Sequence, residues 1–229
     1  MSAPVPVIAV DGPSGAGKGT VARSVAEILG WHFLDSGALY RVTALAAIAQ
    51  GLDLADAPRV AEIAAALPVR FARASEGEEQ ILLNNAEVTR QVRDEKTGEA
   101  ASRVAALPAV RAALVERQRA FAEAPGLVAD GRDMGTAIFP EAAIKIFLTA
   151  SAEERAARRY KQLKEKNFDV TVVDLLQEIE GRDARDINRA DSPLIPAREA
   201  IIIDSTGISA DDVIAEVLRI KNSVLGPGA

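Results

Sequence analysis

Short runs of apolar residues alternate along the chain with longer amphipathic segments. The apolar runs cover residues 5–10, 31–34, 126–129, 143–148 and 200–203. The amphipathic segments have helical spacing and cover residues 17–29, 36–50, 95–106, 109–122, 152–166, 170–188 and 210–223. Strands that are apolar throughout and alternate with helices are typical of a parallel sheet covered on both faces. The pattern therefore predicts an α/β fold with a five-stranded parallel sheet flanked by helices.

Residues 67–90 interrupt this alternation. The stretch reads LPVRFARASEGEEQILLNNAEVTR, in which VRFAR and EQILL are typical of short strands and ASEGE of a polar turn. We expect a small antiparallel insert here on the α/β core. Elsewhere Ser36, Ser151 and Ser209 stand at the expected starts of helices, where serine is favoured as an N-cap.

The composition is that of a globular chain whose surface is not basic. Of the 229 residues, 48% are hydrophobic and only 4% are aromatic, so small and branched aliphatic side chains build the core. The net charge of −6 argues against broad nucleic-acid binding, which needs a basic surface. A few clustered arginines could still bind a small molecule that carries phosphate. We therefore expect one large domain that has no nucleic-acid partner.

Several kinds of site are excluded by the residues that are missing. The chain has no cysteine and a single histidine, His32. Disulfides, thiolate catalysis and cysteine-ligated metals are thereby ruled out, and a histidine metal cluster or a histidine-based triad is not expected. No apolar run approaches the roughly 20 residues of a membrane span, and the start MSAPVPV lacks the pattern of a secretory signal. We expect a cytoplasmic monomer with no membrane partner.

The stretch DGPSGAGKGT, residues 11–20, lies between the first apolar run and the first helix. Gly12, Gly17 and Lys18 have the spacing of a phosphate-binding loop, in which glycines let backbone N–H groups point at the anion. The helix adds its positive N-terminus and the lysine adds a mobile charge. A plain turn of small residues is the alternative, but the order of strand, glycine turn and helix favours a nucleoside triphosphate. The residues expected to bind ATP are Gly12, Pro13, Ser14, Gly15, Ala16, Gly17, Lys18, Gly19 and Thr20.

The hydroxyl of this loop is displaced by one position. Gly19 stands where many such loops carry serine or threonine, and Thr20 follows it. We expect Mg²⁺ to accompany ATP, with Thr20 and Asp130 as candidate ligands, directly or through water. Asp130 ends an apolar run, where a carboxylate can orient the water shell of a metal, but it could equally be a cap or a structural acid. No direct protein ligand is assigned.

The form GPSGAGKGT, with glycine between lysine and threonine, resembles the nucleoside monophosphate kinases. Further matching segments are LDSGALYR (34–41), ASRVAALPAVR (101–111), ADGRDMGT (129–136), KIFLTAS (145–151), RAARR (155–159) and GRDARDINR (181–189). Taken together, in this order and over nearly the whole chain, they resemble the bacterial cytidylate kinase family. The resemblance implies a single P-loop kinase domain over 1–229. It further implies an acceptor-binding region at 36–102, which holds the insert at about 67–90, and a lid segment at 151–168.

The resemblance also implies which residues act. The implied CMP-binding residues are Ser36, Arg41, Ser102, Arg111, Arg132, Asp133, Arg182, Asp186 and Arg189. Of these, it assigns Arg41, Arg132 and Arg189 to the acceptor phosphate, Ser102, Arg111 and Asp133 to cytosine, and Arg182 and Asp186 to the ribose. The implied catalytic residues are Lys18, Arg132, Arg155 and Arg159.

The chemistry of these residue types suits those roles, although other readings stay open. Guanidinium clamps a phosphate in a fork, and a carboxylate accepts from the amine of cytosine but repels the carbonyl that uracil has there. Arg41 could instead be a surface arginine paired with a carboxylate. Ser102 and Arg111 could be ordinary helix residues. Helix-surface pairing is the rival interpretation for two pairs at i,i+4 spacing, Arg182 with Asp186 and Glu154 with Arg158.

The expected reaction is transfer of the γ-phosphoryl group of ATP to CMP or dCMP, giving ADP and CDP or dCDP. Such a phosphotransferase needs alignment and positive charge rather than a covalent intermediate. One alternative is a kinase of the same architecture for another small acceptor, such as UMP, AMP or shikimate. Another is a non-catalytic nucleotide switch, although the NKxD motif of guanine-specific switches is absent from the sequence.

Overall fold

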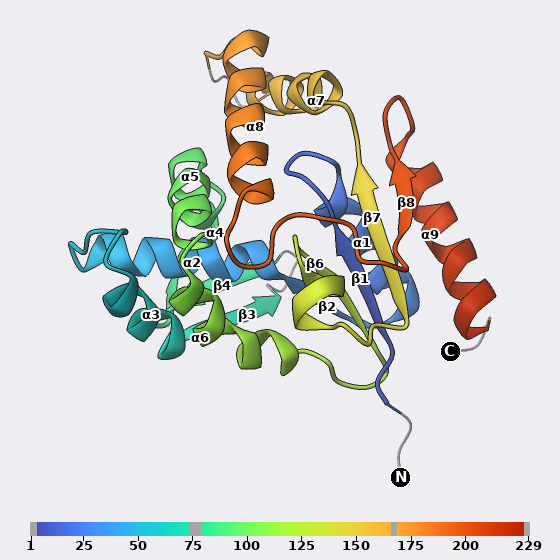
Figure 1. Cartoon of the computed structure of the whole chain (residues 1–229), viewed down its shortest axis with the longest axis horizontal. Coiled ribbons are helices and arrows are strands. Elements are labelled where there is room, and N and C mark those ends of the chain that lie inside the picture. The colour runs from blue at the N-terminus through green and yellow to red at the C-terminus, as the bar shows by residue number, and fades with distance from the viewer. Residues whose placement is uncertain (1–3, 74–78, 166–168, 227–229) are drawn as a thin grey trace. The chain divides into compact units, whose positions relative to one another are not determined.

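The computed structural model describes residues 4–73, 79–165 and 169–226. The chain forms two compact units (Figure 1). The first unit combines Met1–Asp35 with Gln118–Ala229, and the second unit is Ser36–Arg117. None of the helices in the described part of the chain is long and apolar enough to span a membrane.

The first unit is built on a five-stranded sheet with the order β2-β6-β1-β7-β8. Its strands are β1 (Val7–Asp11), β2 (His32–Asp35), β6 (Leu127–Asp130), β7 (Ile144–Thr149) and β8 (Ile201–Asp204). All neighbours are parallel, and the central strand β1 pairs Val10 with Asp130 of β6 and with Ile146 of β7. Every residue of β1 is buried, as expected for a strand covered on both faces. The predicted five-stranded parallel sheet is confirmed.

In the described residues, four helices and one π-helical turn complete the first unit. They are α1 (Lys18–Leu29), η1 (Met134–Ile138), α7 (Ala152–Glu165), α8 (Val172–Ile187) and α9 (Ala210–Leu225). Helices α1 and α9 pack together and share an apolar core with the sheet, in which Val25 and Val217 are fully buried. Helices α7 and α8 pack against each other beyond the carboxyl end of β7 (Figure 1). The turn η1 contacts β1.

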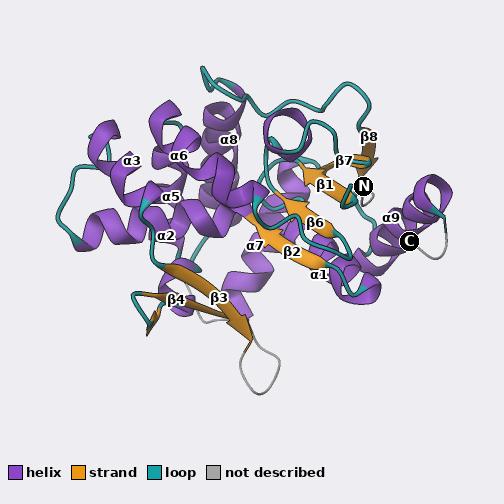
Figure 2. Ribbon diagram, turned by 90° about the horizontal axis from the view of Figure 1, so that it is seen from below, coloured by secondary structure: helices purple, strands orange, loops and turns teal. Residues whose placement is uncertain are grey.

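The second unit is mainly helical and carries the small antiparallel sheet (Figure 2). Its elements are α2 (Ser36–Ala49), α3 (Ala57–Ala65), β3 (Val69–Arg73), β4 (Glu79–Leu83), β5 (Ala86–Glu87), α4 (Thr89–Val92), α5 (Glu95–Val104) and α6 (Pro108–Arg119), whose last residues belong to the first unit. The sheet has the order β3-β4-β5, and Val69 pairs with Leu83. Val42 of α2 and Ile81 of β4 meet in an apolar core. The predicted antiparallel insert is confirmed, while its turn at 74–78 lies outside the described residues.

The hydrophobic pattern missed the shortest elements. Strand β5 and helix α4 have two and four residues, too few to show a period, and η1 is a single π-helical turn. Helix α3 was also missed, although Asp56 caps it by accepting from the N–H of Arg59. Ser151 and Ser209 are confirmed as caps, because their hydroxyls accept from the N–H of the third residue onward. Helix α2 begins at Ser36 itself.

Candidate active site

The loop between β1 and α1 depends on glycine at three positions. Gly12, Gly15 and Gly17 have φ angles of 146°, 79° and 94°, in the region that favours glycine. A side chain at Gly12 would also run into the backbone carbonyl of Leu148 on the neighbouring strand. Gly17 is the N-cap of α1, so the loop ends at the positive end of that helix. This geometry is typical of an anion-binding loop.

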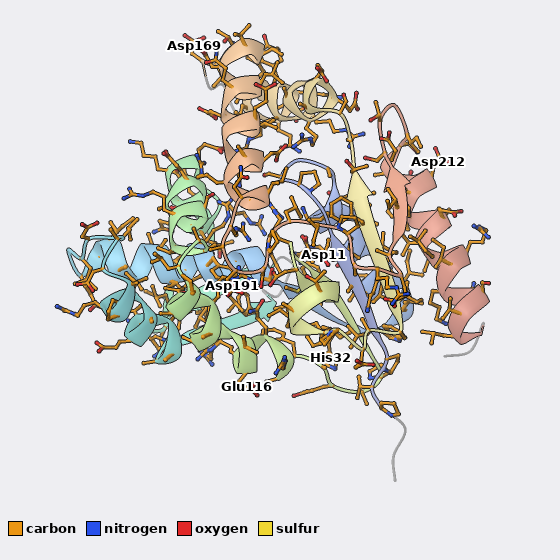
Figure 3. All side chains as sticks on the ribbon, viewed as in Figure 1. Asp11, His32, Glu116, Asp169, Asp191 and Asp212 are labelled. Atoms are coloured by element: carbon orange, nitrogen blue, oxygen red, sulfur yellow. The ribbon has the colours of Figure 1, made fainter. Side chains whose placement is uncertain are left out.

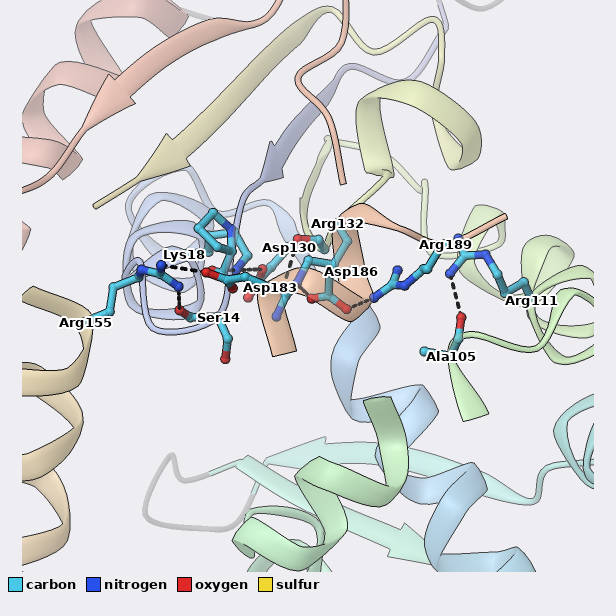
Figure 4. Close-up of polar contacts among 12 residues, drawn as sticks. Ser14, Lys18, Ala105, Arg111, Asp130, Arg132, Arg155, Asp183, Asp186 and Arg189 are labelled. Carbon is cyan, nitrogen blue, oxygen red and sulfur yellow. Dashed lines mark hydrogen bonds and ion pairs between the residues drawn. The ribbon is translucent and has the colours of Figure 1, made fainter. Parts of the chain in front are cut away.

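Lys18 is held beneath this loop. Its Nζ donates to the carbonyl oxygen of Pro13 at 2.8 Å and lies 4.0 Å from Oδ1 of Asp130 (Figure 4). Burial lowers the pKa of Lys18 to about 7, and the positive charge of Arg132 acts in the same direction. A lysine in this setting gains by acquiring further negative charge, so the loop favours an anionic ligand.

The closeness of Asp130 gives a physical reason for Gly19. A Cβ atom at Gly19 would lie 3.3 Å from Oδ2 of Asp130, which is tighter than ordinary van der Waals contact. Asp130 ends β6, next to the phosphate loop in the sheet, and burial raises its pKa to about 6. Thr20 is exposed on the first turn of α1. A serine or threonine at position 19 would therefore crowd the carboxylate, and the hydroxyl is found at position 20 instead.

The side-chain oxygens of Asp130 and Thr20 fit a metal ion that is bound mainly by the phosphates of a nucleotide. In the described residues no group of three acidic or histidine side chains could hold a metal alone. Mg²⁺ commonly uses one or two carboxylates and completes its shell with substrate phosphates and water. Burial raises the pKa of Asp130, and a cation beside its carboxylate would favour the ionised form. Asp130 and Thr20 thus fit an ion that arrives with ATP.

Asp11 is a buried acid that the sequence reasoning missed. It is the last residue of β1, at the opposite end of the sheet from His32, and its side chain is shown in Figure 3. Its two oxygens accept from the N–H groups of Met134 and Gly135, both at 2.8 Å. Burial raises the pKa of Asp11 to about 6, although these two amides favour the carboxylate. The only signal in the sequence was an acid at the end of an apolar run.

This raised pKa makes the stability of the protein depend on pH. Because Asp11 binds its proton more tightly in the folded state, its contribution to the free energy of unfolding is complete below about pH 4 and declines as the pH rises to 6. A shift of about two pKa units corresponds to about 3 kcal/mol. Urea unfolding of the wild type and of Asp11→Asn from pH 4 to 7 measures it. We expect the wild type to lose stability relative to the variant over this range, and parallel profiles would contradict the burial effect.

An ionic network joins α8 to the residues that follow β6 (Figure 4). Asp186 accepts from Nε of Arg132 at 2.9 Å and also pairs with Arg189. Burial alone would favour the neutral acid, but Arg132, Arg189 and Arg182 outweigh it and lower the pKa of Asp186. Three of the predicted CMP-binding residues, Arg132, Asp186 and Arg189, therefore lie in contact, and Arg182 acts on the same carboxylate. Asp133 follows Arg132, is almost fully buried and is the N-cap of η1.

Arg155 connects α7 to the phosphate loop and to α8. Its guanidinium donates to the carbonyl of Ser14 at 3.0 Å and to Oδ2 of Asp183 at 2.6 Å, while Nε donates to the carbonyl of Ala150. The sequence reasoning assigned Arg155 to the lid and gave Asp183 no role in the site. The structure places the guanidinium against the loop that is expected to bind ATP.

Arg158 and Arg159, on the same helix, have different surroundings from Arg155. Arg158 pairs with Glu154 at 2.9 Å and also donates to the carbonyl of Ser205, so the helix-surface pairing is confirmed for it. Arg159 is half-buried on α7.

The second unit holds the other predicted acceptor residues. Arg41 of α2 donates to the carbonyls of Val92 and Asp94 at 3.0 and 3.2 Å. Arg111 of α6 is buried, donates to the carbonyl of Ala105 at 3.3 Å and lies 5.8 Å from the ring centre of Tyr40. Ser102 on α5 and Ser36 at the start of α2 are also buried.

Gly98 leaves the space that the Arg41 guanidinium occupies. Although Gly98 lies inside helix α5, a Cβ there would approach Nη2 and Nη1 of Arg41 to 2.8 and 3.0 Å. Gly98→Ala should displace this flexible side chain while favouring the helix by up to about 1 kcal/mol. We expect the KM for CMP to rise about tenfold, because a displaced Arg41 could no longer donate two parallel hydrogen bonds to the phosphate. The thermal stability should be kept.

Steady-state kinetics and a melting curve test this expectation. The matched control is Gly181→Ala in α8, where the added Cβ would meet only Nη1 of Arg185 at 3.9 Å. It should alter helix stability by a similar amount without changing the KM. An unchanged KM in Gly98→Ala would show that the position of Arg41 does not matter for the acceptor.

Comparison with known proteins identifies clear relatives of this chain. Residues 8–223 match the family described as cytidylate kinase. The chain is 58% identical to the cytidylate kinase of Pseudomonas paraeruginosa over 220 residues, which are 96% of each protein. It is 56% identical to that of Colwellia psychrerythraea over 225 residues, covering 98% of this chain and 100% of the relative. The cytidylate kinase of Aeromonas hydrophila is 55% identical, with 96% of each protein covered.

Proposed function

Because this chain belongs to the cytidylate kinase family, we propose that it transfers the γ-phosphoryl group of ATP to CMP or dCMP. One observation within the first unit carries this proposal. The phosphate loop and the Arg132–Asp133 pair leave adjacent parallel strands, β1 and β6, at their carboxyl ends. Ligands of open α/β sheets bind at that edge. A donor phosphate and an acceptor phosphate are thereby served by neighbouring segments of one rigid sheet.

The proposed mechanism uses alignment and charge. The loop amides and Lys18 hold the phosphates of ATP, and the acceptor phosphate oxygen is already a nucleophile, so no general base is required. Arg132 and Arg189 hold the acceptor phosphate, and Asp186 keeps the first of them oriented through the 2.9 Å contact. Asp130 and Thr20 would help to hold the Mg²⁺ that arrives with the nucleotide, and this ion would supply positive charge next to the transferred group.

The remaining predicted residues have proposed roles that follow from their chemistry. Asp133, Ser102 and Arg111 would read the amine, N3 and O2 of cytosine, and Arg182 with Asp186 would contact the ribose. Arg41 and Ser36 would support the acceptor from α2. Arg155 and Arg159 would supply charge to the transferred group. For Arg155 this requires that phosphate oxygens replace Ser14 and Asp183 as its acceptors.

The domain roles follow the same proposal. Segment 36–102 would form the acceptor-binding region, and 151–168 would act as the lid that excludes water. The last three residues of that segment lie outside the described residues. The cytoplasmic location and the monomeric state remain predictions.

A substrate panel tests the function. ADP release from ATP is measured with CMP, dCMP, UMP and AMP as acceptors, and without an acceptor. We expect CMP or dCMP to give a kcat/KM at least tenfold above UMP and AMP, because a carboxylate repels the carbonyl of uracil. A preference for AMP would overturn the base-reading assignment. Turnover that is indifferent to CMP would favour the nucleotide switch.

A further inference from the structure

The last two residues of β1 hold the segment that carries Arg132 and Asp133 on both of its sides. Before this segment, the N–H of Gly131 donates to the carbonyl of Val10 at 3.0 Å. After it, the N–H groups of Met134 and Gly135 donate to the two oxygens of Asp11. The two functional side chains are therefore fixed by a strand that leads directly into the phosphate loop.

The turn η1 is also held at its other end. The guanidinium of Arg119 donates to the carbonyls of Ile138 at 3.1 Å and Ala137 at 3.4 Å. The peptide groups of a helical turn give its start a partial positive charge and its end a partial negative charge. A carboxylate at the start and a guanidinium at the end therefore both stabilise the turn. Single π-helical turns are rare and frequently occur at functional sites. Asp11 and Arg119 together stabilise a conformation that the backbone seldom adopts.

The contact at the start of η1 leaves little room for adjustment. Asp11 is only 4% exposed, so water does not replace a lost partner. A Cβ at Gly135 would lie 3.4 Å from Oδ2 of Asp11 and 3.2 Å from Cγ of Lys145. Met134 is fully buried. A change in the Asp11 carboxylate must therefore be taken up by the backbone that begins with Asp133.

We propose that Asp11 is a positioning residue for the acceptor nucleotide, because it keeps Arg132 and Asp133 in register with the phosphate loop through the amides of Met134 and Gly135. This inference rests on the proposed function of those two residues. Asp11 itself is not a catalytic residue, since both of its oxygens face protein amides. It ties the donor-binding strand to the acceptor-binding segment within one unit.

The first test is Asp11→Asn, which keeps the shape of the side chain. Its amide has one oxygen and one NH₂ group, so one of the two backbone N–H groups loses its acceptor and faces a donor. We expect the KM for CMP to rise at least tenfold and the preference for CMP over UMP in kcat/KM to fall. The KM for ATP should change less, because both oxygens of Asp11 accept from the amides that follow Asp133.

A purely structural role would give a different pattern. The control is Val217→Ala, which removes fully buried apolar volume from α9 in the core of the same unit. It should lower stability while leaving both KM values and the CMP preference unchanged. If Asp11→Asn behaves like this control, with KM and selectivity within twofold of the wild type, the inference is overturned.

Gly135→Ala provides a second variant in case Asp11→Asn does not fold. It crowds the carboxylate without removing it, and we expect the same selective rise in the KM for CMP, smaller in size. An unchanged KM and selectivity in Gly135→Ala would then overturn the inference. Failure of the proposed function would appear separately, as a wild-type protein that does not phosphorylate CMP.

Discussion

Replacing Lys18 with methionine is expected to reduce kcat for phosphoryl transfer by on the order of a thousandfold. The side chain stays unbranched and nearly as long in this variant, but it loses the charge that lies under the phosphate loop, 2.8 Å from the carbonyl of Pro13. Charge that develops on the transferred group then lacks a preorganised partner. Coupled ADP release at saturating ATP and CMP measures the effect.

Lys221→Met is the matched control for this experiment. Lys221 is also a buried lysine of the first unit, and its Nζ donates to a backbone carbonyl, that of Gly226 at 3.0 Å. It lies near the end of α9, so its loss should affect stability but leave kcat within about twofold, a factor expected when no transition-state contact is removed. A Lys18→Met rate within tenfold of the wild type would exclude the proposed role of Lys18.

Asp186→Asn is expected to lower the free energy of unfolding by about 3 kcal/mol, because the variant leaves Arg132 and Arg189 buried without their counter-ion. The same change should raise the KM for CMP, since both arginines lose their orientation. Urea unfolding at pH 7 measures the first effect and steady-state kinetics the second. A stability loss without any change in KM would make the network structural only.

The pH dependence of this variant adds an independent check. The folded-state pKa of Asp186 is lowered, so its stabilising contribution is present above the unfolded value near 4 and is lost as the pH falls through the folded value. The difference between the wild type and Asp186→Asn should therefore shrink below about pH 4. The control is Glu216→Gln, which removes an exposed carboxylate that pairs with Arg219. It should change the stability little at any pH, and the comparison shows how much of the effect of Asp186→Asn comes from the burial of its ion pairs.

Local patterns were sufficient for the main elements of the fold. An apolar run such as residues 143–148 favours burial of both faces of its strand. Such runs therefore predict a parallel sheet that is covered by helices on both faces. The loop at Gly12–Lys18 was recognisable because its function requires glycines and a lysine at fixed spacing. Short elements were not accessible in this way. Strand β5 pairs with the adjacent β4, and helix α4 packs against α2, β4 and α5, but no period is visible in so few residues.

In the candidate site, too, some features could be predicted from local sequence and others could not. Single arginines could be assigned to phosphate from their chemistry and from the family resemblance. The partners of those arginines could not be assigned, because Arg132 and Asp186 are 54 residues apart and Ser14 and Arg155 are 141 residues apart. Asp11 was overlooked for this reason, since nothing local distinguishes it from an ordinary acid at a strand end. Its importance lies in two amides more than 120 residues away.

The α/β class, the phosphate loop, the antiparallel insert and the family could be recognised from the amino-acid sequence, because each depends on residue types at short, regular spacing. Which charges meet, which acids are buried and why position 19 is glycine became clear from the folded chain. Burial and Coulomb interaction act through space, at distances that chain folding sets and that spacing along the chain does not encode.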